Sequence, residues 1–181
     1  MLLLDILALA LETGPRPEER RLNVLTEETV VSSSPEETWA FFSDAANLEK
    51  LTPGWLNFTI RTPPPIHMRE GTEIDYTIVL HGFPIPWKTR IDVWEPGVRF
   101  VDRQISGPYL WWSHEHRFEP LEGGGTRVRD RVEFLPRARW VTSPFVSRAV
   151  RQIFEFRRWK LQALFRESHE IEPRINTDQH G

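Results

Sequence analysis

The sequence contains no cysteine, and Lys50, Lys88 and Lys160 are its only lysines. The absence of cysteine excludes disulfide bonds, thiolate nucleophiles and Cys-ligated zinc, and it gives no sign of an oxidising compartment. A net charge of −3 provides no overall positive field for nucleic acid or an anionic membrane. No apolar run reaches the roughly 18 residues that a membrane-spanning helix needs. We therefore expect a cytoplasmic protein that binds no nucleic acid and does not insert stably into a membrane.

The length and composition of the chain indicate one domain with short extensions. The chain has 181 residues, a hydrophobic content of 39% and eight tryptophans, enough for a sizeable core. Its apolar start, MLLLDILALALE, lacks the basic first region of a signal peptide and is interrupted by Asp5. We predict an apolar leader and linker at residues 1–21, a domain at 22–171 and a disordered tail at 172–181. The leader is a possible contact between chains in an oligomer.

Local patterns give an order of elements along the domain. Ser34-Pro35-Glu36-Glu37 is a capping box with proline in the first turn, which predicts a helix there and a second short helix near 47–51. Alternating and β-branched segments predict strands. The predicted strands cover residues 22–31, 55–61, 72–81 and 87–95, two strands within 100–118 joined at Gly107-Pro108, and 126–135. The Pro-rich segment 82–86 is predicted to be a loop too irregular for a tight hairpin.

A long helix is predicted at residues 144–171, with a wide apolar stripe on one side. The arginines predicted to lie on its opposite, solvated side are Arg148, Arg151, Arg157, Arg158 and Arg166. The last strand likewise points Arg127, Arg129, Arg131 and Glu133 toward solvent. A sheet with one wet face needs cover on the other, and the long helix is the only element large enough. We predict an α+β helix-grip fold, a curved antiparallel sheet of about seven strands around a C-terminal helix, with a cavity between them.

The segment FVDRQISGPYLWWSHEHRF, residues 100–118, puts polar side chains on a face that should be apolar. Alternation places Phe100, Asp102, Gln104 and Ser106 on one face of the first strand, and Trp112, His114, His116 and Phe118 on one face of the second. Their aromatic members indicate that both sets point inward. Loop lengths set Asp102 beside His114, Gln104 beside Trp112, and His116 beside Asp130 on the next strand.

This inward polar set has four interpretations that the sequence leaves open. The groups can satisfy one another and cross-link the strands, anchor the polar end of a ligand, or form His–Asp pairs for acid–base chemistry. Two histidines and two carboxylates are also chemically adequate for zinc or iron. The His-x-His spacing, however, follows from strand alternation in general, so we predict no metal and no cofactor.

The chain resembles the START/Bet v 1-like (SRPBCC) superfamily over residues 22–166. Two segments carry the resemblance: SSPEETWAFFSDAANLEKLTPGWL and DRQISGPYLWWSHEHRFEPLEGGGTRVRDRVEF. The second is similar to the D-x-Q-x-x-G-P, W-x-H-x-H-x-F and G-G-T-x-x-x-D pattern of a bacterial polyketide cyclase/dehydrase-like group. The matching positions are Asp102, Gln104, Gly107, Pro108, Trp112, His114, His116, Phe118, Gly124, Gly125, Thr126 and Asp130. The superfamily implies the helix-grip fold but mixes binders, lipid-transfer proteins and enzymes, so it does not settle a function.

We predict that the chain binds a small hydrophobic or amphipathic molecule in the cavity between the sheet and the long helix. The predicted ligand-binding residues are Tyr76, Asp102, Gln104, Trp112, His114, His116, Phe118, Asp130 and Phe156. One alternative is a cyclase/dehydratase-like enzyme in which a His–Asp pair moves protons on a polyketide or similar carbonyl compound. Another is an interaction protein with a filled cavity, whose apolar leader contacts a partner. The sequence does not decide whether the chain is an enzyme.

Overall fold

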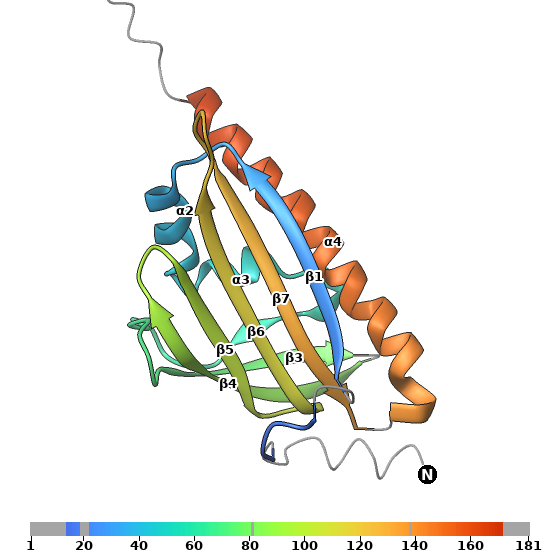
Figure 1. Cartoon of the computed structure of the whole chain (residues 1–181). Coiled ribbons are helices and arrows are strands. Elements are labelled where there is room, and N and C mark those ends of the chain that lie inside the picture. Colours follow the sequence, from blue (N-terminus) through green and yellow to red (C-terminus); the bar gives the residue numbers. More distant parts are fainter. Residues whose placement is uncertain (1–13, 19–21, 81, 138, 172–181) are drawn as a thin grey trace, which may run out of the picture.

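The computed structural model describes residues 14–18, 22–80, 82–137 and 139–171 (Figure 1). The predicted leader at residues 1–13, the end of the linker and the predicted tail at 172–181 lie outside these ranges, so the contact between chains through the leader stays a prediction. No helix in the described part of the chain is both long and apolar enough to cross a membrane.

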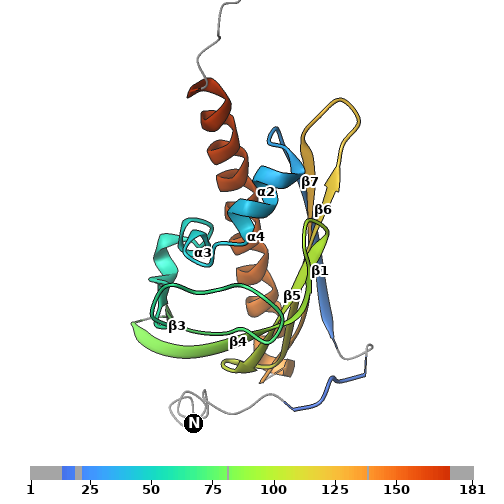
Figure 2. The ribbon, with the colours of Figure 1, turned by 90° about the vertical axis from the view of Figure 1, so that its left-hand side faces the viewer.

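The described residues form one antiparallel sheet and three α-helices. The elements in chain order are β1 (Asn23–Val31), α2 (Pro35–Phe42), α3 (Asn47–Lys50), the 3-10 turn η2 (Gly54–Leu56), β2 (Thr59–Ile60), β3 (Glu73–Leu80), β4 (Phe83–Glu95), β5 (Arg99–Ser106), β6 (Tyr109–Pro120), β7 (Thr126–Pro136) and α4 (Arg139–Ile171). The strand order is β1-β7-β6-β5-β4-β3-β2. Figure 2 shows the sheet curving, with all three helices on one side of it. The predicted helix-grip fold is confirmed.

The start of α2 follows the sequence signal directly. The Ser34 hydroxyl accepts a hydrogen bond from the Glu37 backbone N–H at 3.1 Å, and the Glu37 carboxylate accepts one from the Ser34 N–H at 3.0 Å. These two bonds satisfy N–H groups that a helix N-terminus otherwise leaves unpaired. The helix therefore begins at Pro35 and buries Thr38 and Phe42.

Three predicted boundaries are wrong. Residues 55–61 form η2 and the two-residue strand β2 instead of a full strand, because Asn57 takes a left-handed conformation (φ 41°) between them. The segment 82–86 is no loop: β4 begins at Phe83, which pairs with Leu80. Gly82 makes that tight connection with φ 83°, a value that glycine adopts without a steric penalty. Helix α4 begins at Arg139, five residues before the predicted start at Pro144.

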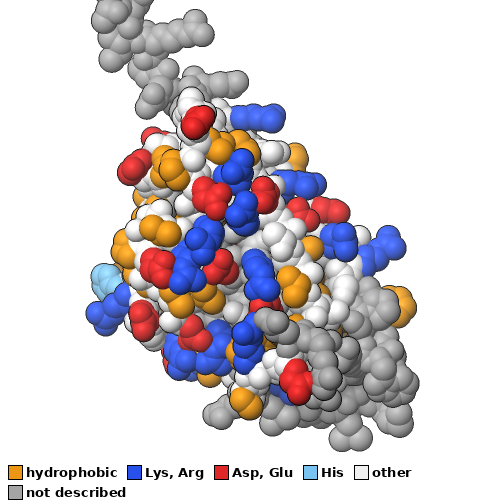
Figure 3. All heavy atoms as spheres, viewed as in Figure 1, with side chains coloured by type: hydrophobic (Ala, Val, Ile, Leu, Met, Phe, Trp, Pro, Cys, Tyr) orange, Lys and Arg blue, Asp and Glu red, His pale blue; other side chains and the backbone are white. Residues whose placement is uncertain are grey.

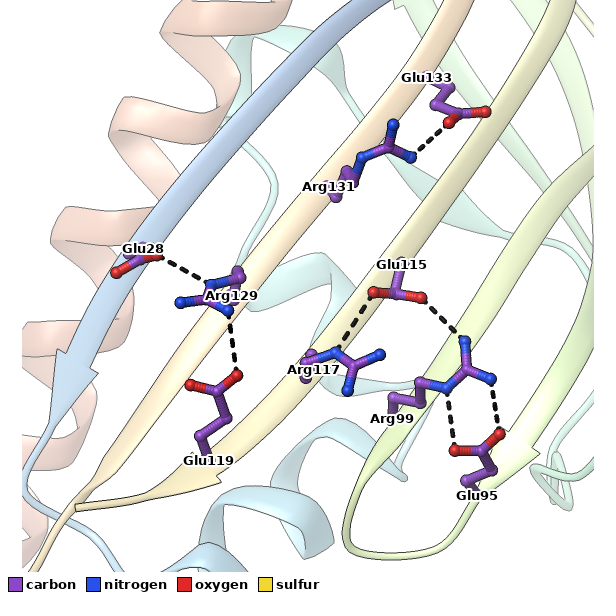
Figure 4. A network of polar contacts seen from close by, with 9 residues as sticks. All are labelled: Glu28, Glu95, Arg99, Glu115, Arg117, Glu119, Arg129, Arg131 and Glu133. Atoms are coloured by element: carbon purple, nitrogen blue, oxygen red, sulfur yellow. Dashed lines mark hydrogen bonds and ion pairs between the residues drawn. The ribbon is translucent and has the colours of Figure 1, made fainter. Parts of the chain in front are cut away.

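The outer face of the sheet carries arginines and carboxylates in alternation (Figure 3). Arg129 bridges Glu28 on β1 (2.8 Å) and Glu119 on β6 (3.1 Å), and Arg99 bridges Glu95 and Glu115 (Figure 4). These contacts confirm that the β7 arginines point outward. Glu133 differs from the prediction because its side chain is only 8% exposed, covered on this face by contacts with Arg16 and Arg131.

The hydrophobic core lies between the sheet and α4. Near β5 and β6 it gathers Phe42, Phe100, Phe118, Leu161 and Phe165, and toward β3 and β4 it gathers Ile74, Tyr76, Ile78, Ile85 and Trp87. A third cluster joins Val132 and Phe134 of β7 to Val150 and Phe154 of α4. Burial of these side chains from both layers holds the helix on the sheet.

Candidate functional site

A cavity of about 250 Å³ lies between the sheet and α4. Its lining is mostly apolar and aromatic and comes from the sheet, from α4 and from the α2–η2 region. The wall residues used below are Tyr76, Trp87, Thr89, Asp102, Tyr109, Trp112, His114, His116, Ala149, Phe154 and Arg157. Trp55, which lines the cavity while 52% exposed, lies at its rim. The volume is just below the range typical of small-molecule sites, about 300–1,000 Å³.

Five of the predicted ligand-binding residues line this cavity: Tyr76, Asp102, Trp112, His114 and His116. The other four are not among its lining residues: Gln104, Phe118, Asp130 and Phe156. Phe118 is buried in the core against Trp39 and Phe42. Phe156 is half-buried on α4 beside Trp159, and its neighbour Phe154 supplies the aromatic wall instead.

Gln104 holds the turn between β5 and β6. Its side-chain amide donates to the Tyr109 carbonyl at 2.8 Å, and its carbonyl oxygen accepts from the Tyr109 N–H at 3.2 Å. A side chain on Gly107 would collide with this amide, because a Cβ there would lie 2.7 Å from Oε1. The Gln–Gly pair of the motif therefore shapes the turn, and Gln104 contributes to the cavity by positioning Tyr109.

The polar wall of the cavity follows the predicted strand register. Asp102 pairs with His114 across β5 and β6, and His116 pairs with Asp130 across β6 and β7. The side chains, however, also bond diagonally. His114 Nε2 lies 2.9 Å from Asp130 Oδ1, and His116 Nε2 lies 3.1 Å from Asp102 Oδ2. Since His116 Nδ1 is also 3.0 Å from Asp130 Oδ1, the two carboxylates lie on opposite sides of the imidazole pair.

Arg157 of α4 completes this polar cluster and is missing from the predicted site. It was assigned to the solvated side of the helix, yet it is only 5% exposed. Its Nη2 lies 3.0 Å from His116 Nδ1 and its Nε lies 3.4 Å from Asp130 Oδ2. The signal was present in the sequence. Position 157 follows Val150 by seven residues and precedes Leu161 by four, which is the spacing of one helix face.

Both carboxylates of the cluster are held in the ionised form. Burial raises the pKa of Asp130, but the charge of Arg157 and the hydrogen bonds from His114 and His116 outweigh it, so the pKa lies well below its ordinary value. Burial also raises the pKa of Asp102, and the hydrogen bond from His116 together with the nearby His114 leaves it lowered. Asp102 is the more accessible of the two, with 17% of its side chain exposed against 3% for Asp130.

His114 is neutral, with one nitrogen available to the cavity. Burial and the neighbouring His116 lower the pKa of His114 to about 4, against the opposing effect of the two carboxylates. Ionised Asp130 can only accept, so the single ring proton lies on Nε2 and is donated to it. Nδ1 is then an acceptor. It lies 3.7 Å from Asp102 Oδ2 and makes no hydrogen bond to any described residue.

This lowered pKa predicts an acid-dependent loss of stability. The pKa of His114 is about 4 in the folded state and about 6.5 in the unfolded state, so the unfolded state binds the extra proton more readily. The contribution of neutral His114 to the free energy of unfolding is fully present above about pH 6.5. It is lost as the pH falls toward 4, a loss of about 3 kcal/mol. We expect urea unfolding with EDTA present to show this slope, and His114→Gln to remove it.

The control for this slope is His67→Gln, a change at an exposed histidine outside the cluster. It should leave the pH dependence as in the native chain. Equal slopes between pH 6.5 and 4 in the native chain and in His114→Gln would contradict the neutral state of buried His114.

Another part of the cavity wall offers a hydrogen-bond donor. The Tyr76 side chain lines the cavity and makes no hydrogen bond among the described residues. The indole N–H of Trp87 is also unpaired there, but it is fully buried. Burial, with the charge of Asp102 nearby, raises the pKa of Tyr76 well above its ordinary value, and burial likewise raises the pKa of Tyr109. Both hydroxyls therefore keep their protons. The cavity wall combines the acceptors of Asp102 and His114 with the donor hydroxyl of Tyr76.

Three atoms of the cluster can serve as metal ligands. One ligand atom each from Asp102, His114 and His116 lies within 4.8 Å of the other two. The sequence predicted no metal because His-x-His spacing alone is unspecific. In the folded chain, the Asp102 carboxylate lies beside these two imidazoles.

Comparison with known protein families assigns the chain to one of them. A family profile described as "Domain of unknown function (DUF8410)" matches residues 29–165. The chain belongs to this family. The match covers both segments on which the SRPBCC resemblance depends and every residue of the polar cluster. A search of curated proteins finds no match to this DUF8410 chain.

Solved structures share the fold of the DUF8410 chain at low sequence identity. The Zhui aromatase/cyclase from Streptomyces sp. R1128 aligns with a TM-score of 0.64 and 14% identity, over 82% of this chain and 96% of its own. Norcoclaurine synthase from Thalictrum flavum aligns at 0.60 and 16%, over 82% and 96%. Protein Ms6760 from Mycobacterium smegmatis aligns at 0.62 and 16%, over 87% and 99%. These are Bet v 1-like (SRPBCC) structures, and the likeness establishes that fold for the chain.

Proposed function

We propose that this DUF8410 chain binds a small hydrophobic or amphipathic molecule in the cavity between the sheet and α4. The observation that carries the proposal is an interior space of about 250 Å³ with aromatic walls and one polar side. Space of this kind costs stability, because its lining atoms lose packing contacts. A ligand that fills it recovers those contacts. The interior is not filled by side chains, so the alternative of a vestigial, filled cavity finds no support here.

The polar wall favours a ligand end that is uncharged. Asp102 presents an ionised carboxylate and His114 presents the acceptor Nδ1, 3.7 Å apart. A hydroxyl group can donate to either of them and accept from Tyr76. An anionic end would face the charge of Asp102. Arg157, the one arginine or lysine among the described residues that line the cavity, already compensates Asp130.

A second candidate is proton transfer to or from the bound molecule. The specific observation in its favour is the Asp130–His114 pair, in which the carboxylate fixes the ring proton on Nε2 and leaves Nδ1 toward the cavity. A neutral imidazole held in this way can act as a general base on a carbonyl compound. Two of the fold relatives are named aromatase/cyclase and norcoclaurine synthase, which is compatible with this candidate. Incorporation of solvent deuterium into a bound ketone distinguishes it from binding alone.

Titration with a matched pair of small aromatics tests the proposed function. We expect the EDTA-treated chain to bind one equivalent of 2-naphthol, and to bind 2-naphthoate about tenfold more weakly or worse, a difference of about 1.4 kcal/mol. The physical reason is that naphthoate brings a second carboxylate against Asp102, whereas naphthol brings a donor. Quenching of tryptophan fluorescence and isothermal titration calorimetry measure both affinities.

Two results of this titration would contradict the proposal. If neither compound binds, the cavity does not accept a bicyclic aromatic and the proposed function fails. Preference for the carboxylate would show that cationic groups, and not the acceptors of Asp102 and His114, dominate the polar wall.

A further inference from the structure

We propose that Asp102, His114 and His116 bind a divalent transition-metal ion at the polar wall of the cavity, with Zn²⁺ as the ion that suits these ligands. The proposal goes beyond hydrophobic ligand binding and does not depend on it. Two imidazoles and one carboxylate, with a further position open, form a ligand set common to zinc and non-haem iron centres.

The distances from the Asp102 carboxylate to the two imidazoles fit one small ion. Asp102 Oδ2 lies 3.1 Å from His116 Nε2 and 3.7 Å from His114 Nδ1. Ligands at about 2.0–2.1 Å from a tetrahedral zinc are about 3.3 Å apart, and the two observed separations bracket this value. Because all three side chains line the cavity, the fourth position of the ion faces the space where a ligand would lie.

Asp130 lies where it can orient both imidazoles for this role. The nitrogen of each ring that does not face Asp102 contacts the same oxygen, Asp130 Oδ1: His114 Nε2 at 2.9 Å and His116 Nδ1 at 3.0 Å. A metal-binding histidine usually donates its other N–H to a carboxylate or carbonyl, which fixes the ring and the position of its proton. Here one carboxylate can serve both rings, while Arg157 compensates its charge from the far side.

Packing restricts the two rings to this orientation. Phe100 stacks on His116 with ring centroids 4.2 Å apart, and Phe154 meets His114 edge-on at 5.1 Å. The two imidazoles are themselves 3.7 Å apart. Little rearrangement is then needed to bring both lone pairs onto one ion.

Metal binding changes the hydrogen bonds of His116. Without metal, His116 Nε2 lies 3.1 Å from Asp102 Oδ2, and Nδ1 lies 3.0 Å from both Arg157 Nη2 and Asp130 Oδ1. With the ion on Nε2, the ring proton lies on Nδ1 and is donated to Asp130, so Arg157 no longer donates to Nδ1 and keeps its contact with Asp130 Oδ2. His114 keeps the proton position that it already has, since its Nδ1 is the acceptor in both states.

Zinc titration of the EDTA-treated full chain, followed by dialysis and elemental analysis, tests the proposal. We expect one equivalent of Zn²⁺ per chain. Asp102→Asn and His114→Gln should each weaken affinity about 100-fold or more, and Asp130→Asn, acting through ring orientation, about 10–100-fold. His67→Gln is the matched control, because it removes an exposed imidazole outside the ligand set and should leave zinc affinity unchanged. Circular dichroism checks that each variant is folded.

Cobalt provides a readout that survives if a ligand variant fails to fold. Co²⁺ bound to the native chain by three protein groups in a four- or five-coordinate site gives visible absorption bands. Weak zinc uptake that is equal in the native chain and in Asp102→Asn, or stoichiometric cobalt without such bands, would mean that surface groups bind the metal and would overturn the proposal. The naphthol titration uses the EDTA-treated chain without added metal, so failure of one test leaves the other intact.

Discussion

Replacing Arg157 by methionine is expected to lower the free energy of unfolding by about 3–5 kcal/mol, the range for removing one partner of a buried ion pair. Methionine keeps much of the packing of the side chain against Phe42 and Phe154. What it removes is the cation 3.4 Å from Asp130 Oδ2, which leaves a carboxylate with a 3% exposed side chain uncompensated. Urea unfolding at pH 7 measures the change.

The neighbouring residue supplies the control. Arg158 lies on the same helix and pairs with Glu27 at 3.3 Å, but its side chain is 46% exposed. Arg158→Met should cost less than about 1 kcal/mol, as exposed ion pairs do. Adding Asp130→Asn to Arg157→Met should recover more than half of the loss, because the uncompensated charge is gone. Equal costs for the two methionine variants would show that Arg157 is not part of a buried charge network.

Ala149→Phe is expected to weaken 2-naphthol binding about 100-fold or more, equivalent to about 2.7 kcal/mol. Ala149 lies on α4 and lines the cavity, so a benzyl group there competes for the same space of about 250 Å³. The added ring fills a void instead of displacing well-packed atoms, so the midpoint of thermal unfolding should change little. Calorimetric titration and thermal unfolding give the two values.

Ala163→Phe is the matched change on the same helix, at a half-buried position that is not among the cavity lining residues. It should bind 2-naphthol as the native chain does. If Ala149→Phe binds with unchanged affinity, the compound occupies some other surface, and the cavity is not the ligand site.

The fold could be predicted because its signals are local. The Ser34 capping box fixes where α2 begins, and alternation along β6 and β7 determines which side chains face inward. The pairing of Asp102 with His114 and of His116 with Asp130 followed from turn lengths alone. Each of these inferences depends on residues close in sequence or on a strand period of two.

The details of the site depend on packing between distant elements, and the sequence alone did not give them. Strand register sets which Cα atoms are neighbours, but it does not decide that His114 turns its Nε2 to Asp130 and not to Asp102. Gln104 was expected at a ligand, although its amide is used by the turn at Gly107. The burial of Arg157 could have been inferred from its spacing to Val150 and Leu161, because an arginine on an apolar helix face needs a buried partner.

The sheet joins the beginning of the domain to its end, since β1 pairs along its whole length with β7. Asn23 lies opposite Phe134, 111 residues later in the chain. During synthesis on the ribosome, the first strand therefore has no partner until nearly the whole domain has emerged. Loop closure over such a distance is entropically costly and slows folding. The backbone of nascent β1 thus stays without its β7 partner for most of the synthesis of the domain.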